Sequence, residues 1–327
     1  MKSLAVLLCA LFFVSPAFAA KKYSYFRIGN PNDISTTTTP GTVLMGGSTD
    51  VDAAFQWMCQ RSGGGDFLVI RATGTDAYNP YIQSLCPAGN SVATLIIPNR
   101  TMASDPFVIE AIQKAEALWI AGGDQSNYIN YWKGTPVETE LNNLITRGAP
   151  IGGTSAGMNV LSQFIYSAQA AQGVTSSQAL ADPFSRYITL ERDFVNLSIL
   201  QGLIDDPHFA ARDRMGRDLA FMCRIFLNGW SATPRDIAID ERTALLIDAS
   251  GNGSVVGESN VYFMQAPGAP ELCQAKTPLT YQNIAVYRIS STGTFNLATW
   301  TGSGGVAYTV SANAGVLSST QPGGSIY

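Results

Sequence analysis

One serine of the sequence lies in a setting suited to nucleophilic attack. Residues 149–160 combine a short apolar run, a Gly-rich corner and a helix-like segment, and Ser155 occupies the corner within 153–157, Gly-Thr-Ser-Ala-Gly. A serine hydroxyl becomes a nucleophile only when the backbone holds it out toward a base. A sharp strand-to-helix turn does this, and Gly153 and Gly157 remove side chains that would collide there. The pattern predicts a catalytic serine or, alternatively, an ordinary tight turn.

The only histidine among the 327 residues is His208, in the segment 205–209, Asp-Asp-Pro-His-Phe. General-base catalysis on a serine most often uses imidazole, because its proton affinity suits neutral pH. His208 follows a predicted strand, so it is the one candidate base. The alternative is an ordinary, partly buried histidine without a catalytic role.

An acidic pair further along the chain could orient that histidine. Asp240 and Glu241 separate two apolar, strand-like runs at 236–239 and 243–247. An acid between two buried strands is either a turn residue or a site residue. The resulting order along the chain is serine, histidine, acid, which differs from the serine, acid, histidine order of α/β-hydrolases.

Apolar periodicity predicts alternating strands and helices in the first half of the chain. The predicted strands are 42–45, 66–70, 92–98 and 118–121, and the predicted helices are 50–60, 78–85, 105–115 and 137–147. Such alternation indicates an α/β fold, a three-layer sandwich with a mostly parallel, doubly wound sheet. A further helix is predicted over 210–227, and short strands are predicted after 232.

Three of the predicted strands end at paired glycines, 46–47, 122–123 and 152–153. Ligands of parallel sheets bind outside the carboxyl ends of the strands, so these pairs are expected to line one crevice. Within it, the N–H of Ala156 and an N–H from 122–124, taken as that of Gly123, are candidate donors to an oxyanion.

Composition excludes several classes of function. Apolar residues make up 46% of the chain, which is typical of a globular protein with a sizeable core. The net charge of −4 gives no electrostatic footprint for nucleic acid. Only 13% of the residues are charged.

The first 20 residues have the pattern of a signal peptide. A basic start at Lys2 precedes an apolar run over 4–14 and an Ala-x-Ala pattern ending at Ala19. That run is too short to span a bilayer. We expect a signal peptide over 1–20, a polar leader over 21–40 and a single hydrolase domain over 41–327. The mature chain is expected to be secreted, extracellular or periplasmic, without membrane association.

Four cysteines remain after the signal peptide, Cys59, Cys86, Cys223 and Cys273. An even number in an oxidising compartment indicates two disulfides. The pairing with the shortest loops is Cys59–Cys86 with Cys223–Cys273, but the sequence leaves all three pairings open. With one histidine and no close cysteine pair, we expect no metal and no other cofactor.

Several segments together resemble cyanophycinase and its relatives, the serine exopeptidase family that includes aspartyl dipeptidase. The resemblance extends over 42–261. The matching segments are 44–47 (Leu-Met-Gly-Gly), 119–125 (Trp-Ile-Ala-Gly-Gly-Asp-Gln), 153–157, 206–209 with its trailing arginines, and 239–244 (Ile-Asp-Glu-Arg-Thr-Ala). The combination is specific, although no single segment is.

This resemblance implies a role for each matching residue. It makes Ser155 the nucleophile, His208 the base and Glu241 the acid that orients the base. The residues that it assigns to the substrate pocket are Gln125, Asp206, Arg212, Arg214 and Arg217. It implies hydrolysis of cyanophycin, a poly-aspartate backbone with arginine on each β-carboxyl, and release of β-Asp-Arg dipeptides. The family glutamine before the histidine is Pro207 here, which puts the polymer substrate in doubt.

The arginines have two interpretations. Arg214 and Arg217 either belong to a solvated helix face of ion pairs or face the site, where guanidinium groups would bind a substrate carboxylate in a fork. A substrate guanidinium would instead need acids, and Asp206, Asp240 and Asp124 are the nearest. Asp124 also suits a helix N-cap.

The same residues bear on functions other than that of a peptidase. An α/β-hydrolase esterase would need a second histidine after His208. A class I glutamine amidotransferase shares the expected fold but has cysteine where this chain has Ser155. An aspartyl dipeptidase acting on small Asp-Xaa peptides and a non-catalytic peptide-binding relative remain alternatives. A peptide is the expected partner, and the chain could also form a homodimer.

Overall fold

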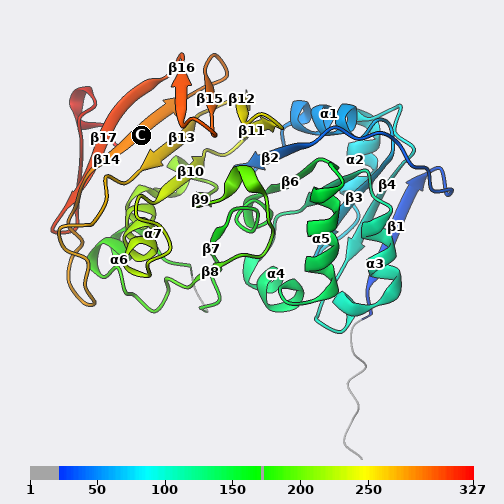
Figure 1. Cartoon of the computed structure of the whole chain (residues 1–327), viewed down its shortest axis with the longest axis horizontal. Coiled ribbons are helices and arrows are strands. Elements are labelled where there is room, and N and C mark those ends of the chain that lie inside the picture. The colour runs from blue at the N-terminus through cyan, green and yellow to red at the C-terminus, as the bar shows by residue number, and fades with distance from the viewer. Residues whose placement is uncertain (1–21, 171–172) are drawn as a thin grey trace, which may run out of the picture.

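The computed structural model describes residues 22–170 and 173–327, and the predicted signal peptide over 1–20 lies outside them. Within the described residues, strands form a ten-stranded sheet, a six-stranded sheet and a two-stranded ribbon (Figure 1). The strands of the larger sheet are, in spatial order, β1 (Ser24–Gly29), β4 (Ser91–Ile96), β3 (Asp66–Arg71), β5 (Ala117–Ile120), β6 (Ile151–Thr154), β2 (Gly41–Met45), β11 (Thr243–Asp248), β12 (Asn252–Gly257), β15 (Thr294–Asn296) and β16 (Thr301–Ser303).

The centre of the larger sheet is parallel and its flanks are antiparallel. Strands β4, β3, β5, β6 and β2 pair in parallel, as the alternation of strands and helices predicts. Strand β1 pairs antiparallel with β4, and β11, β12, β15 and β16 continue antiparallel from β2. The α/β class is confirmed, but the prediction of a mostly parallel sheet is wrong outside this centre. Short turns join β11 to β12 and β15 to β16, and such turns permit only antiparallel pairing.

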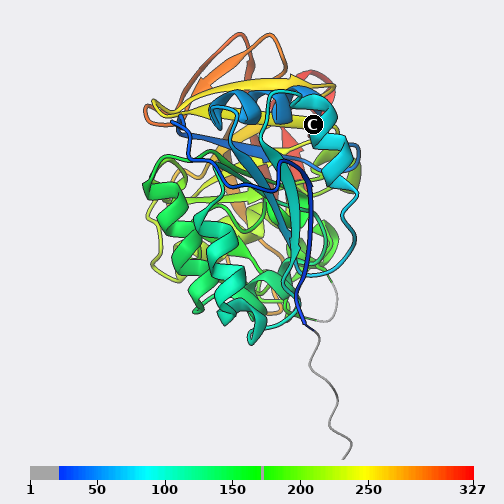
Figure 2. The same ribbon diagram turned by 90° about the vertical axis from the view of Figure 1, so that its right-hand side faces the viewer.

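Helices cover both faces of the parallel strands (Figure 2). Helices α1 (Asp52–Arg61) and α2 (Tyr78–Leu85) pack on one face, and α3 (Pro106–Gln113) and α5 (Pro136–Thr146) on the other. Because side chains alternate along a strand, Val43 of β2 faces α1 whereas Leu44 faces the opposite cluster. Burial on both faces explains why apolar residues follow one another without polar alternation at 43–45 and 67–70.

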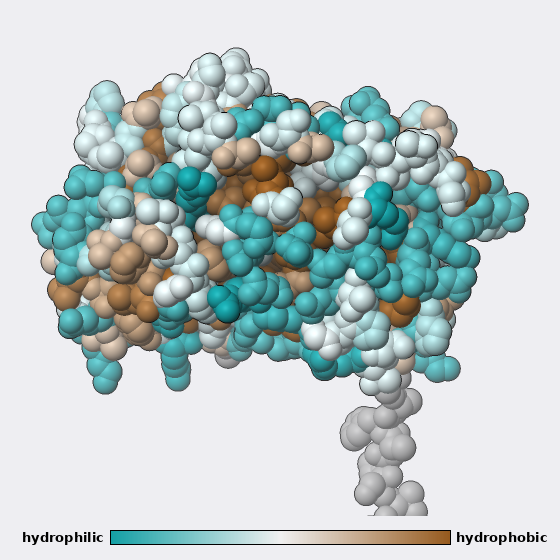
Figure 3. Space-filling model, viewed as in Figure 1, coloured by the Kyte–Doolittle hydropathy of each residue, from teal (hydrophilic) through white to brown (hydrophobic). Residues whose placement is uncertain are grey.

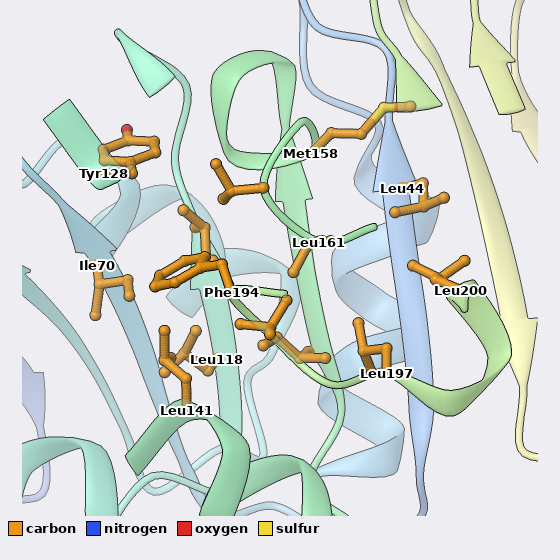
Figure 4. Close-up of a cluster of buried hydrophobic side chains, with 14 of the residues drawn as sticks. Leu44, Ile70, Leu118, Tyr128, Leu141, Met158, Leu161, Phe194, Leu197 and Leu200 are labelled. Carbon is orange, nitrogen blue, oxygen red and sulfur yellow. The ribbon is translucent and has the colours of Figure 1, made fainter. Parts of the chain in front are cut away.

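The chain after the serine turn contributes to the same core. Figure 4 shows Met158 and Leu161 among the buried side chains of the cluster that contains Phe194 and Leu197. The predicted helix at this point is limited to one 3₁₀ turn, η2 (Ser155–Gly157). The following residues form turns and are buried, so packing against the sheet replaces helix extension here.

The smaller sheet was not predicted as a separate unit. Its strands are, in spatial order, β18 (Val316–Ser319), β17 (Val306–Asn313), β14 (Tyr281–Ile289), β13 (Val261–Gln265), β10 (Arg235–Ile239) and β9 (Leu203–Asp206). Only β9 and β10 pair in parallel among these described strands. Helices α6 (Ser176–Ala181) and α7 (Met215–Leu227) pack against this sheet in a second hydrophobic cluster.

The remaining elements are short. They are α4 (Gln125–Trp132), the ribbon strands β7 (Phe164–Tyr166) and β8 (Leu190–Arg192), and the 3₁₀ turns η1 (Met102–Ser104), η3 (Ser198–Leu200), η4 (Ala210–Arg212) and η5 (Pro322–Gly324).

Local sequence signals predicted most of the helices that pack on the larger sheet. Asp105 caps α3 by accepting the N–H of Phe107 at 2.9 Å, and Asp124 caps α4 by accepting the N–H of Ser126 at 2.9 Å. The helix predicted over 210–227 is interrupted, because Asp213 has a left-handed φ of +48° between η4 and α7.

The polar leader is also more structured than predicted. Residues 24–29 form β1, whose side chains alternate between the two faces of the sheet edge. Tyr25 packs edge-on against Phe107 of α3, with ring centroids 5.0 Å apart. This aromatic contact recruits the segment to the sheet.

Both disulfides of the shortest-loop pairing are present in the described chain. Cys59 bonds to Cys86, joining α1 to the end of α2, and Cys223 of α7 bonds to Cys273. Among the described residues, no helix has the length and apolar character needed to cross a membrane.

Candidate active site

Ser155 stands at the carboxyl end of β6, at the centre of the larger sheet. Its φ of +53° is left-handed, an unusual conformation for a residue other than glycine. The two flanking glycines permit this turn. A Cβ on Gly153 would lie 2.5 Å from the backbone of Gly157, and a Cβ on Gly157 would lie 2.0 Å from the carbonyl oxygen of Ile120. The predicted steric reason for these glycines is confirmed.

His208 and Glu241 come from the smaller sheet. His208 lies two residues beyond the end of β9, and Glu241 lies two residues beyond the end of β10. Because β9 and β10 are parallel neighbours, their carboxyl ends meet at one edge. The adjacency of these two strands therefore brings histidine and acid together.

The three side chains form a continuous hydrogen-bonded row. Ser155 Oγ lies 2.7 Å from His208 Nε2, and His208 Nδ1 lies 2.7 Å from Glu241 Oε1. This arrangement fits the tautomer in which Nδ1–H donates to the carboxylate and Nε2 accepts from the hydroxyl. It has the geometry required to move a proton from a serine to an imidazole.

The glycine pair after β2 holds the two sheets together at this point. The carbonyl of Gly46 accepts the N–H of His208 at 2.8 Å, and the carbonyl of Gly47 accepts the N–H of Arg242 at 2.9 Å. A Cβ on Gly47 would lie 2.4 Å from His208 Cε1 and 3.1 Å from Ser155 Cβ. Gly47 also has a left-handed φ of +91°. Glycine is therefore required between the serine and the imidazole.

The surroundings set the charges of the row. Burial lowers the pKa of His208, the hydrogen bond to Glu241 opposes this, and the nearby Arg212 and Arg214 lower it further. The hydrogen bond from His208 is the main cause that lowers the pKa of Glu241. At neutral pH the imidazole is thus neutral and the carboxylate ionised, the states that general-base catalysis needs.

Asp240, the other acid of the pair, faces away from this row. Its Oδ1 accepts the N–H of Ala210 at 3.0 Å, and its Oδ2 accepts the hydroxyls of Ser259 at 2.7 Å and Tyr262 at 3.3 Å. Asp240 therefore anchors the turn after His208, while Glu241 contacts the imidazole.

A cavity of about 390 Å³ is lined by residues at the start of α4 and at the start of α7. Its lining includes Gly123, Gln125, Arg214 and Arg217, all predicted site residues. Gln125 is held by donating its Nε2–H to the carbonyl of Tyr166 at 3.3 Å. On the face viewed in Figure 3, hydrophobic atoms gather near β6 and β9, between the two sheets, and hydrophilic atoms surround them.

Asp206 is buried and forms ion pairs with the two arginines that line this cavity. Arg217 Nε donates to Asp206 Oδ2 at 2.6 Å, and a second Arg217 nitrogen contacts Oδ1. Arg214 Nη1 donates to Asp206 Oδ1 at 3.0 Å. The Arg217 side chain is only 5% exposed and its guanidinium carbon lies 5.0 Å over the ring of Tyr166. The alternative of a solvated ion-pair face is therefore wrong for Arg217.

Arg212 is placed differently from the other two arginines. Its side chain is 54% exposed, and its Nε lies 3.8 Å from Glu241 Oε1. It lies next to the acid of the row rather than on the lining of the 390 Å³ cavity. The structure thus brings Arg214 and Arg217 together with Gln125, and separates Arg212 from them.

Three more carboxyls are wholly buried around Asp206, those of Asp205, Asp218 and Asp236. Burial is the largest cause that raises the pKa of each well above its ordinary value, and neighbouring carboxylates add to the effect. Asp218 shares side-chain hydrogen bonds with Asp206 and with Asp236, and such a bond between two carboxyls requires a proton on one of them. Two guanidinium groups cannot neutralise four carboxylates, so this cluster retains protons at neutral pH.

Replacing Asp218 with asparagine is expected to stabilise the protein increasingly as the pH rises. A buried acid with a raised pKa keeps its proton in the folded state, whereas the unfolded chain releases it above about pH 4. The wild-type protein therefore loses about 1.4 kcal/mol of stability per pH unit for each such proton, until the pH reaches the folded pKa. Asp218→Asn removes one of these protons. Urea unfolding at pH 5 and pH 7.5 measures the difference.

The matched control is Glu258→Gln, because Glu258 forms an exposed ion pair with Arg242 at 3.0 Å. Its effect on stability should be small at both pH values. A difference between wild type and Asp218→Asn that stays constant from pH 5 to pH 7.5 would show that Asp218 is ionised in the folded protein.

Among residues 22–170 and 173–327, no group of three or more histidine, cysteine, aspartate or glutamate side chains is arranged to hold a metal ion.

Sequence reasoning missed two contributors to the site. Ser48 forms a side-chain hydrogen bond to Glu241 that helps lower the pKa of that acid. Tyr166 supports both Gln125 and Arg217. The position of Ser48 directly after Gly46 and Gly47 was the available signal, whereas Tyr166 reaches the site only through the β7–β8 ribbon.

The part of this chain that matches known sequences contains the residues of the candidate site. A sequence profile of Peptidase family S51 matches residues 45–251, which contain Ser155, His208 and Glu241. The cyanophycinase of Synechococcus elongatus is 25% identical over 255 residues, covering 74% of this chain and 73% of its own length. The cyanophycinase of Thermosynechococcus vestitus matches with the same identity and coverage.

A solved structure gives a consistent picture of the fold. A peptidase from an acI-B1 Actinobacterium superposes with a TM-score of 0.50 at 17% identity, covering 72% of this chain and 96% of that one. The matched α/β architecture is therefore that of a known peptidase structure.

Proposed function

The chain belongs to peptidase family S51 and is a serine-type exopeptidase, and on this basis we propose that it hydrolyses cyanophycin or related β-aspartyl peptides through Ser155, His208 and Glu241. The observation that carries the proposal is the row of two 2.7 Å contacts from Ser155 through His208 to Glu241.

In the proposed mechanism Ser155 Oγ attacks the carbonyl carbon of the scissile amide. His208 Nε2 takes the hydroxyl proton, and Glu241 stabilises the imidazolium that forms. The imidazolium then protonates the leaving amine, which departs and leaves an acyl-enzyme on Ser155. Water, deprotonated by His208, attacks the acyl-enzyme and releases the acid product.

The N–H groups of Ala156 and Gly123 are proposed to hold the oxyanion. Tyr128 Oη donates to the carbonyl of Gly122 at 3.2 Å. In a trans peptide the N–H points opposite to the carbonyl, so the N–H of Gly123 is directed away from Tyr128. An ideal Cβ on Gly122 would lie 3.5 Å from Ser155 Cβ, which puts this peptide beside the nucleophile. Losing one such donor typically costs about 10²- to 10³-fold in rate.

The charges around the cavity favour a substrate that carries a free carboxylate. Arg214 and Arg217 both bind Asp206, and Arg217 Nε also lies 4.0 Å from Asp218 Oδ1. Arg214 also donates to the carbonyl of Pro207 at 2.7 Å. Two guanidinium groups therefore line the cavity beside one lining carboxylate, Asp124, and a guanidinium binds a substrate carboxylate in a fork. Of the acids weighed for a substrate guanidinium, Asp206 and Asp240 are engaged, and Asp124 remains at the cavity.

Two alternative functions would use the same site. An aspartyl dipeptidase would also use Arg214 and Arg217 of the lining to bind a carboxylate of a small Asp-Xaa peptide. A non-catalytic relative would bind peptides without turnover.

We also propose a specific fold and a cellular location for the protein. The helices on both faces of the parallel strands support a three-layer arrangement similar to class I glutamine amidotransferases. We propose one hydrolase domain over 41–327, to whose larger sheet residues 24–29 of the leader add the edge strand β1. We also propose that the protein is secreted after loss of residues 1–20. The two disulfides are compatible with an oxidising compartment.

The deciding experiment is incubation of the protein with insoluble cyanophycin, a β-Asp-Arg-containing peptide and α-Asp-Xaa dipeptides, with release of products followed by chromatography. We expect cleavage of the β-aspartyl substrates. Cleavage of only the α-Asp dipeptides would select the dipeptidase. Absence of turnover on every substrate, together with failure of a fluorophosphonate to label Ser155, would select the binding protein.

A further inference from the structure

The turn that carries His208 and Arg214 is conformationally unusual. Both His208 and Asp213 have left-handed φ values, +51° and +48°, which residues other than glycine rarely adopt. Between them lies η4, and directly after Asp213 comes Arg214, the N-cap residue of α7. Such a turn persists only when surrounding contacts hold it.

The start of α7 lacks a cap from its own N-cap residue. Arg214 forms no side-chain capping hydrogen bond, since its guanidinium is a donor and binds Asp206. The first N–H groups of a helix need acceptors from outside the helix. The N–H of Met215 donates to the hydroxyl of Tyr327 at 3.0 Å, although Tyr327 lies 112 residues further along the chain.

The same hydroxyl also fixes the left-handed residue. Tyr327 Oη donates to Asp213 Oδ1 at 2.8 Å, so one phenol group bridges the side chain of Asp213 and the backbone of α7. Both partners flank Arg214. A single hydroxyl therefore holds both sides of the arginine that lines the cavity.

The ring of Tyr327 reaches the other end of the turn. It packs edge-on against Phe209, with ring centroids 5.3 Å apart, and against Tyr262 at 6.4 Å. Phe209 directly follows His208 and is fully buried. Figure 1 marks this end of the chain among β13, β14 and β17 of the smaller sheet.

The segment that delivers Tyr327 is itself anchored. Ser325 Oγ donates to the carbonyl oxygen of Tyr327 at 2.7 Å, and Tyr308 Oη donates to the carbonyl of Ile326 at 3.2 Å. These contacts lie beyond residue 251, where the match to family S51 ends. The bridge is thus supplied by a part of the chain outside the family match.

We propose that Tyr327 is a positioning residue that acts through the 209–215 turn on His208 and Arg214. This inference rests on the proposed function of those two residues. Tyr327 contacts neither the nucleophile nor the lining of the cavity, so its effect is indirect. It fixes the imidazole for attack and the guanidinium for substrate binding.

The test is Tyr327→Phe, which removes the hydroxyl and keeps the ring. Loss of one hydrogen-bonding group is expected to slow fluorophosphonate labelling of Ser155 by about 3- to 10-fold at 20 °C. In turnover of a β-aspartyl peptide, kcat should fall because His208 is less well positioned. KM should rise because Arg214 is less well positioned to bind substrate. The matched control is Tyr281→Phe, whose hydroxyl donates to the carbonyl of Gly268 at 2.7 Å in the same hydrophobic cluster, away from the turn.

A second variant separates positioning from mere stability. Asp213→Gly removes the acceptor of the Tyr327 hydroxyl, and glycine adopts the left-handed φ of this position without strain. If both groups act through one contact, the double variant should label no more slowly than the slower single variant. If Tyr327→Phe fails to fold, slower labelling of Asp213→Gly alone supports the inference, and labelling at the wild-type rate contradicts it.

Two results would overturn the inference. One is a wild-type rate of labelling and wild-type kcat and KM in folded Tyr327→Phe, with only the melting temperature lowered. The other is a double variant whose two effects multiply. If wild-type protein is not labelled at Ser155, the proposed function itself fails, which is a different outcome from a labelled wild type with an equally labelled variant.

Discussion

Replacing Ser155 with alanine is expected to lower kcat on a β-aspartyl peptide by about 10⁴- to 10⁶-fold while the protein stays folded. The hydroxyl is the group that would form the acyl-enzyme, and no other described hydroxyl takes its place 2.7 Å from His208 Nε2. The residual rate would come from oxyanion stabilisation and substrate binding alone.

The measurement combines turnover with labelling. Ser155→Ala should lose both product release and reaction with a fluorophosphonate, and its urea midpoint should match that of the wild type. The matched control is Ser84→Ala, a serine of α2 whose hydroxyl donates to the carbonyl of Tyr81 at 2.7 Å. Ser84→Ala should retain full activity. Turnover within tenfold of wild type in Ser155→Ala would assign the nucleophile to another residue.

Replacing Glu241 with glutamine is expected to cost about 10⁴-fold in kcat with little change in KM. The amide preserves the size of the side chain but offers no charge to stabilise the imidazolium. Its NH₂ group could also turn toward His208 Nδ1, which would favour the tautomer that cannot accept the serine proton through Nε2. Both effects act on the chemical step rather than on the cavity that binds substrate.

Asp240→Asn is the matched comparison, because Asp240 is the neighbouring acid with different partners. Asp240 holds the N–H of Ala210 and the hydroxyls of Ser259 and Tyr262, so the variant should lose stability and less than about tenfold in kcat. Steady-state kinetics and thermal melting of both variants separate the two roles. A larger loss of kcat in Asp240→Asn than in Glu241→Gln would exchange their assignments.

Local signals in the sequence determined the elements around the nucleophile. Residues 43–45 and 67–70 are continuous apolar runs because both faces of the parallel sheet are covered by helices. Asp105 and Asp124 cap helices because their carboxylates accept the first free N–H groups. The glycines 46–47 and 153 could be recognised as strand ends where side chains would collide. These effects depend on neighbours in the chain or on one periodic pattern.

Contacts between distant segments were not predictable in the same way. Alternation of strands and helices correctly predicted the parallel centre of the sheet, but the antiparallel flanks depend on which distant strands pair. The arginine segment had two readings because periodicity cannot tell a solvated helix face from a buried one. In the structure Arg217 binds the buried Asp206 and lies over the ring of Tyr166. These contacts exclude a solvated helix face for Arg217.

The sequence by itself therefore predicted the groups proposed to react: one serine in a glycine corner, one histidine, and an acid at 240 or 241. Only the tertiary structure decided that the serine comes from one sheet and the histidine and Glu241 from another. It also selected Glu241 over Asp240 and brought Tyr327 to the start of α7. The physical reason is that strand pairing and burial are set by the packing of whole elements, which no local run of residues encodes.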